Sequence, residues 1–128
     1  MYFEHAALNV PDPKAMAEWY VTHCGAHIVS TQDEPPYTSF LSDATGRVIF
    51  EIYANPEAPI PDYGDQHPLC LHIAFAVENI DADRDRLLDA GAELFSEETL
   101  ANGSRLVMLR DPWGIPLQLV KRGVPLVG

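Results

Sequence analysis

The sequence is poor in basic residues, with 8 lysines and arginines against 19 aspartates and glutamates in 128 residues. The resulting formal net charge of −11 argues against a nucleic-acid-binding protein, because phosphates need a basic surface. The sequence also lacks an apolar stretch of membrane-spanning length and a basic-plus-apolar leader. We therefore expect a soluble, cytoplasmic protein that binds neither nucleic acid nor membrane.

Cysteine is scarce as well, and the two cysteines are too few for a disulfide framework. Cys24 lies at an expected helix end and Cys70 in an expected buried strand, so we interpret both as small reduced hydrophobic residues. The length fits one domain of ordinary size with a real core.

Two apolar segments with the same design stand out in this background. The run 69–77 has the length and composition of a strand and carries His72 in its middle. The run 3–10 reads the same way and carries His5, 67 positions earlier. The same offset relates Glu51, in the apolar run 48–53, to Gln118, in the run 115–120. The chain is therefore expected to be a doubled module.

These four side chains would each cost free energy if they were buried in apolar strands without a partner. A single divalent metal would account for all of them, because two imidazoles, one carboxylate and one amide oxygen suit Zn, Ni, Co, Mn or Fe(II). Of the four, Glu51 is the candidate proton-transfer base, since an amide does not exchange protons usefully.

The remaining signals give each half the order β-α-β-β-β. In the first half Pro13 and Gly25 delimit a helix, and in the second half Asn79 and Gly91 do so. The other expected strands cover residues 26–31, 37–41, 47–53, 92–95, 105–110 and 115–120, with a polar excursion at 97–103. Residues 55–68, rich in proline, read as a linker between the halves.

This pattern resembles the vicinal oxygen chelate superfamily, which includes glyoxalase I, methylmalonyl-CoA epimerase, extradiol dioxygenases and bleomycin-binding proteins. The resemblance rests on His5, on the helix end Gly91-Ala92, and on residues 111–119, which match the family's Asp-Pro-x-Gly-x-x-(Glu) ending. It implies an α+β fold whose paired modules form a curled mixed sheet around a cleft. The implied organisation is a single domain, 1–128, with module one at 1–54, a linker at 55–68, module two at 69–122 and a tail at 123–128.

The resemblance also implies a function and a site. His5, Glu51, His72 and Gln118 correspond to the family's metal ligands, although Gln118 departs from the Glu that metal-dependent members usually have. The implied protein is a homodimeric, glyoxalase I-like lyase or isomerase, acting on a small molecule with two adjacent oxygens. The alternatives are a metal-free small-molecule binding protein of the antibiotic-binding type and, with weaker support from Gln118, an extradiol-type dioxygenase. Arg105 and Arg110 are expected to be solvated edge charges.

Overall fold

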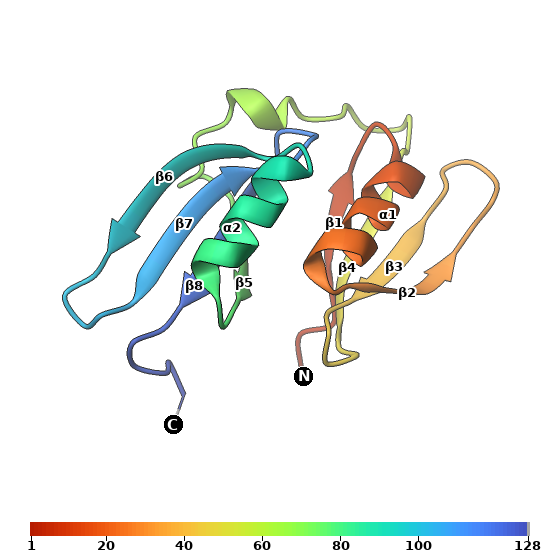
Figure 1. Cartoon of the computed structure of the whole chain (residues 1–128). Coiled ribbons are helices and arrows are strands. Elements are labelled where there is room, and N and C mark those ends of the chain that lie inside the picture. The colour runs from red at the N-terminus through yellow and green to blue at the C-terminus, as the bar shows by residue number, and fades with distance from the viewer. Residues whose placement is uncertain (128) are drawn as a thin grey trace. The chain divides into compact units, whose positions relative to one another are not determined.

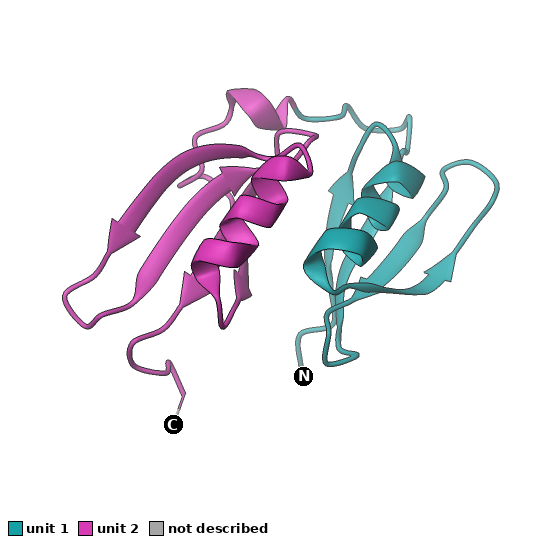
Figure 2. Cartoon of the chain, in the orientation of Figure 1, with its two compact units in different colours: residues 1–61 teal, residues 62–128 magenta. Residues whose placement is uncertain are grey.

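The computed structural model describes residues 1–127, which form two compact units, residues 1–61 and 62–127 (Figure 2). Within residues 1–127 neither α-helix is long and apolar enough to cross a membrane. Each unit has the element order β-α-β-β-β, so the predicted doubled module is confirmed.

The first unit is a four-stranded mixed sheet with one helix on it (Figure 1). Its elements are β1 (Ala6–Asn9), α1 (Pro13–Cys24), β2 (His27–Thr31), β3 (Ser39–Ser42) and β4 (Val48–Tyr53). The strand order is β1-β4-β3-β2, with β1 parallel to β4 and the other pairs antiparallel. The core lies between helix and sheet, where the rings of Tyr20 and Phe50 pack edge to face with centroids 6.1 Å apart.

The second unit repeats this plan after a short 3-10 helix. Its elements are η1 (Tyr63–Asp65), β5 (Ile73–Ala76), α2 (Ile80–Asp89), β6 (Glu93–Thr99), β7 (Arg105–Arg110) and β8 (Pro116–Lys121). The strand order β5-β8-β7-β6 matches that of the first unit, and β5 is parallel to β8. The expected α+β fold class, with two β-α-β-β-β modules, is confirmed.

The two helices begin in the same way. The carboxylate of Asp12 accepts a hydrogen bond from the Ala15 amide, and the side-chain oxygen of Asn79 accepts one from the Ala82 amide. Each capping side chain satisfies one of the amides that a helix start leaves without a backbone partner. The helix boundaries predicted from the sequence follow from these caps.

The strand boundaries differ from the prediction around both histidines. β1 begins at Ala6 and β5 at Ile73, so His5 and His72 lie just before their strands and not inside them. In the second unit the reason is visible in the register, which pairs Ile73 with Leu117 and so places His72 next to Pro116, which has no amide hydrogen for the ladder.

The run 69–77 is also less buried than expected. Cys70 is exposed and lies in a turn, where its amide donates to the His67 carbonyl. The prediction of a buried strand at Cys70 was therefore wrong. The polar excursion predicted at 97–103 was wrong in part, because β6 continues through Thr99 and pairs with β7 as far as Arg105.

Candidate functional site

The first unit brings His5 and Glu51 together on the face of the sheet that α1 does not cover. Phe50 and Ile52 are buried on the helix side, so strand alternation turns Glu51, which lies between them, to the other side. There the His5 Nε2 and Glu51 Oε1 atoms are 3.6 Å apart. Two ligands of one ion, each at about 2.0–2.2 Å from it, are separated by roughly 3.0–3.6 Å. The pair therefore has the spacing that a shared metal requires.

The orientation of the His5 ring is set by its other nitrogen. Nδ1 lies 3.0 Å from Glu4 Oε1, and since an ionised carboxylate only accepts, Nδ1 carries the proton. In a neutral ring this leaves the lone pair on Nε2, the atom that faces Glu51. A carboxylate on the far nitrogen is the usual support for a metal-binding histidine.

The second unit holds His72 in the equivalent state. The His72 Nδ1 atom lies 2.9 Å from the Pro68 carbonyl oxygen, which can only accept a hydrogen bond. Nδ1 is therefore the donor, and in the neutral ring Nε2 again keeps its lone pair. Both histidines therefore donate through Nδ1, His5 to the Glu4 carboxylate and His72 to the Pro68 carbonyl oxygen.

The backbone register at Glu51 and at Gln118 is identical. Ala7 pairs with Glu51 across β1 and β4, and Ala74 pairs with Gln118 across β5 and β8. The 67-residue offset seen in the sequence is therefore a true structural equivalence of strands.

The burial on which the sequence argument relied is smaller than expected. The side chains of His5 and Glu51 are 30% and 24% exposed, and His72 is exposed. Their burial therefore does not by itself require a metal, whereas the orientation of the two rings would suit one. Among residues 1–127, no three His, Cys, Asp or Glu side chains converge as a metal-binding group.

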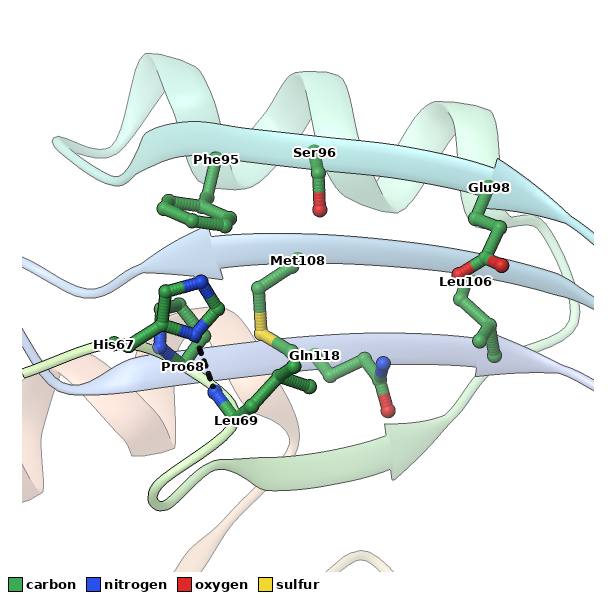
Figure 3. Close-up of a pocket in the computed structure, with 9 residues that line it drawn as sticks. All are labelled: His67, Pro68, Leu69, Phe95, Ser96, Glu98, Leu106, Met108 and Gln118. Carbon is green, nitrogen blue, oxygen red and sulfur yellow. Dashed lines mark hydrogen bonds between the residues drawn. The ribbon is translucent and has the colours of Figure 1, made fainter.

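Gln118 lies on the helix-free face of the second unit, because its neighbours Leu117 and Leu119 are buried on the other side. It lines a hollow of about 230 Å³. Figure 3 shows the wall side chains projecting from β6, β7 and β8 on the side away from α2. The residues that line this hollow, hereafter the second-unit hollow, are His67, Pro68, Leu69, Phe95, Ser96, Glu98, Leu106, Met108 and Gln118.

Sequence reasoning singled out only Gln118 in this hollow. Phe95 enters it because the β6–β7 register shifts between Leu94 and Ser96, a β-bulge that breaks the alternation of faces. The equivalent irregularity in β2, between Ile28 and Ser30, gives Val29 to a hollow of about 670 Å³ in the first unit. A bulge has no marked composition here, so the sequence carried no signal for it.

Arg110 supports the wall of the second-unit hollow. Its guanidinium donates to the carbonyl oxygens of Tyr63 at 3.0 Å, Gln66 at 2.8 Å and Gly114 at 3.1 Å. It also lies 5.6 Å from the ring centroid of Phe95. The expectation of a solvated edge charge is therefore wrong for Arg110, whereas Arg105 forms an ion pair with the exposed Asp81 at 2.9 Å.

Comparison with known proteins agrees with this architecture. The ethylmalonyl-CoA/methylmalonyl-CoA epimerase of Cereibacter sphaeroides is 33% identical over 95 residues, which cover 70% of this chain and 71% of that protein. A glyoxalase family protein from Bacillus cereus has a similar structure, with a TM-score of 0.76 at 20% identity over 94% of this chain and 93% of the other. The antibiotic binding protein TnmS3 from Streptomyces sp. CB03234 has a TM-score of 0.68 at 17% identity, covering 94% and 95% of the two chains.

A family model places these similarities in one group. The model of the glyoxalase, bleomycin resistance protein and dioxygenase superfamily matches residues 2–119, which is nearly the whole sequence. The chain belongs to the glyoxalase/bleomycin resistance protein/dioxygenase superfamily.

Proposed function

We propose that the protein is a metal-dependent enzyme of the lyase or isomerase type, acting on a small molecule that presents two adjacent oxygens. The observation that carries the proposal is the state of His5, whose Nδ1 atom is held by Glu4 while its Nε2 atom lies 3.6 Å from Glu51. His72, with its Nδ1 atom held by the Pro68 carbonyl, supports a second pair of ligands with Gln118.

By the chemistry of its donor atoms, the proposed set of His5, Glu51, His72 and Gln118 would suit one divalent ion of the Zn, Ni, Co, Mn or Fe(II) class. When bound, such an ion would supply Lewis-acid polarisation of two adjacent substrate oxygens. The two imidazoles and the Gln118 amide are neutral, so Glu51 is the single negative ligand. The role of Glu51 is then to take a proton from the carbon next to a polarised carbonyl.

A single carboxylate limits the chemistry that this set can perform. Inversion at one carbon requires proton removal on one face and delivery on the other, and Gln118 cannot deliver a proton. Glu51 can instead return the proton to the neighbouring carbon, which is an isomerisation, or hold it while a leaving group departs, which is a lyase reaction. The epimerase relative supports proton transfer beside a carbonyl, and the ligand set of this chain favours the one-base forms.

The second candidate function is metal-free binding of a small molecule. It is supported by the apolar wall of the second-unit hollow, where Phe95 is 46% exposed, and by the fold shared with TnmS3. An extradiol-type dioxygenase is less favoured, because Gln118 stands where the resemblance expects a carboxylate.

Metal content separates the two candidates. Elemental mass spectrometry is to be done on protein purified without a polyhistidine tag, beside His5→Ala and His72→Ala, with the exposed His27→Ala as matched control. We expect about one transition metal ion per chain, retained in the control and lost in the other two variants. Absence of metal after supplementation with Ni, Zn, Mn and Fe(II) would retire the enzyme proposal in favour of metal-free binding.

A positive result defines the next measurements. 2-Oxoaldehyde thiol adducts, hydroxy acids with a labile proton, and catechols are then to be screened with the metal found. The homodimer expected from the family resemblance stays a prediction, and light scattering on the purified protein tests it.

A further inference from the structure

The second-unit hollow has one charged side chain among the residues that line it, and this charge is negative. Glu98 lies on β6 opposite Leu106 of β7, and both residues line the hollow. Figure 3 shows the Glu98 carboxylate at the end of the hollow opposite His67. Within residues 1–127 the Glu98 side chain has no hydrogen bond or ion pair, whereas its neighbour Glu97, on the other face of β6, pairs with Arg84 at 2.6 Å.

Among residues 1–127, no cationic side chain lines the hollow beside Glu98. Arg110 keeps its positive charge but is not among the lining residues, and its guanidinium donates to the carbonyl oxygens of Tyr63, Gln66 and Gly114. His67 Nδ1 accepts a hydrogen bond from the Leu69 amide at 3.1 Å, so this nitrogen is not a donor toward a ligand. A ligand in the hollow therefore meets one carboxylate and no available cation among the lining residues.

Apolar side chains form a large part of the remaining wall, beside the polar His67, Ser96 and Gln118. Leu69, Phe95, Leu106 and Met108 contribute its apolar surface, and Phe95 presents an aromatic ring. A cavity of about 150 Å³ holds a benzene molecule. The hollow, at about 230 Å³, has room for one ring and a short side chain.

We infer that the second-unit hollow binds the apolar ring of a small ligand and that Glu98 selects a ligand bearing a cationic amine over one bearing an anion. The inference names the substrate class of the proposed site and rests on the proposed function only where the ligand also chelates a metal, because Gln118 belongs both to the hollow and to the ligand set. Glu98 is thus a specificity-determining residue.

The test uses two pairs of probes that differ in charge. 2-Phenylethylamine and 3-phenylpropanoate share a ring and a two-carbon chain but carry opposite charges, and neither has adjacent oxygens. Dopamine and 3-(3,4-dihydroxyphenyl)propanoate form the corresponding chelating pair. Binding is measured by calorimetry at millimolar probe concentration, under nitrogen, with and without Zn²⁺, for the wild type, Glu98→Gln and Glu97→Gln.

Glu97→Gln is the matched control, because it removes the same charge from the adjacent residue of β6 but on the opposite face. We expect the wild type and Glu97→Gln to prefer the amine of each pair by about two- to fivefold at low salt, the range for an exposed ion pair. Glu98→Gln should lose this preference, and added salt should weaken it in the wild type. An equal preference in all three proteins, or no binding of either simple probe, overturns the inference.

The two pairs distinguish failure of this inference from failure of the proposed function. If Zn²⁺ strengthens binding of both catechols equally in all three proteins while the amine preference is absent, the metal site stands and the role of Glu98 is wrong. If 2-phenylethylamine is preferred through Glu98 but Zn²⁺ does not affect catechol binding, the hollow stands and the metal proposal fails.

Discussion

The strands that carry the candidate ligands share one backbone register in the two units but carry different side chains. In the first unit the position opposite Ala7 is Glu51, and in the second unit the position opposite Ala74 is Gln118. The two units therefore place a side chain at the same backbone position, but that side chain is a carboxylate in the first unit and a neutral amide in the second. We attribute the negative charge of the proposed metal site to the first unit alone.

The same comparison applies to the turns that lead into β4 and β8. Asp43 accepts hydrogen bonds from the amide and hydroxyl of Thr45, and Asp111 accepts them from the amides of Trp113 and Ile115. Asp111 is 3% exposed, whereas Asp43 is half-buried. The same kind of aspartate-capped turn is therefore more exposed at Asp43 in the first unit and more buried at Asp111 in the second.

Exchanging the two ligand side chains gives the largest expected effect. Glu51→Gln should weaken metal binding by on the order of tenfold or more, because it removes the only negative ligand of the proposed set. Gln118→Glu should strengthen it, and the double variant should bind metal about as the wild type does. Competition with a fluorescent chelator measures these affinities. Equal affinity in the wild type and Glu51→Gln would contradict the ligand role of Glu51.

The next largest difference between the two units is expected in the loss of stability when a turn glycine is replaced by alanine. Gly46 and Gly114 both have positive φ, 90° and 84°, but a Cβ at Gly114 would lie 2.8 Å from the Gly64 amide nitrogen while one at Gly46 would meet nothing within 4 Å. Gly114→Ala should therefore lower the free energy of unfolding by about 3 kcal/mol or more, and Gly46→Ala by about 1 kcal/mol from backbone strain alone.

Urea unfolding checks this prediction unit by unit, because Trp19 lies in the first unit and Trp113 in the second. Trp113→Phe leaves fluorescence from the first unit, and Trp19→Phe leaves it from the second. Similar losses for both glycine variants would show that the contact between Gly114 and Gly64 does not constrain the turn.

Replacing the aspartates that cap the same two turns should give a smaller difference in stability between the units. Asp111→Ala leaves the part-buried Trp113 amide and the buried Ile115 amide without their acceptor and should cost about 2–4 kcal/mol. Asp43→Ala should cost about 1 kcal/mol or less, because the Thr45 amide can then bond to water. The same single-tryptophan unfolding experiments measure both, and a larger loss for Asp43→Ala would reverse the comparison.

The smallest expected effect is the pH dependence of stability that Asp43 contributes. The hydrogen bond from the Thr45 hydroxyl lowers the pKa of Asp43 below the ordinary value of an aspartate side chain. A carboxyl whose pKa is lower in the folded state stabilises that state above its unfolded pKa, and this contribution is lost as the pH falls through the folded pKa. The stability difference between the wild type and Asp43→Asn should therefore be present at neutral pH and should shrink below about pH 4. A difference that does not change with pH would contradict this assignment.

The fold could be predicted from the sequence because its signals are local. Hydrophobic period, the caps at Asp12 and Asn79 and the glycines that end or follow the helices each act within a few residues. β6 was predicted to end too early because Glu97 and Glu98 read as a loop. As an edge strand it is exposed along its whole length, so composition does not distinguish it from a loop.

The candidate site could be predicted only in part. The 67-residue offset identified His5, Glu51, His72 and Gln118, because equivalent strands repeat in the sequence. The hydrogen bonds that orient the His72 ring and hold Arg110 beside the second-unit hollow could not be predicted. Their acceptors, one for His72 and three for Arg110, are backbone carbonyl oxygens. Any residue offers a carbonyl, so the sequence does not show which one a side chain will find.

The bulges in β2 and β6 have a consequence for how this scaffold can change its ligand. Each bulge inserts one residue, Val29 or Phe95, that lines a hollow while the flanking residues keep their pairing. Replacement of that one side chain reshapes the wall without shifting the strand ladder. Under the proposed function, these two positions, one per unit, are where we expect substitutions to alter ligand binding with the least effect on folding.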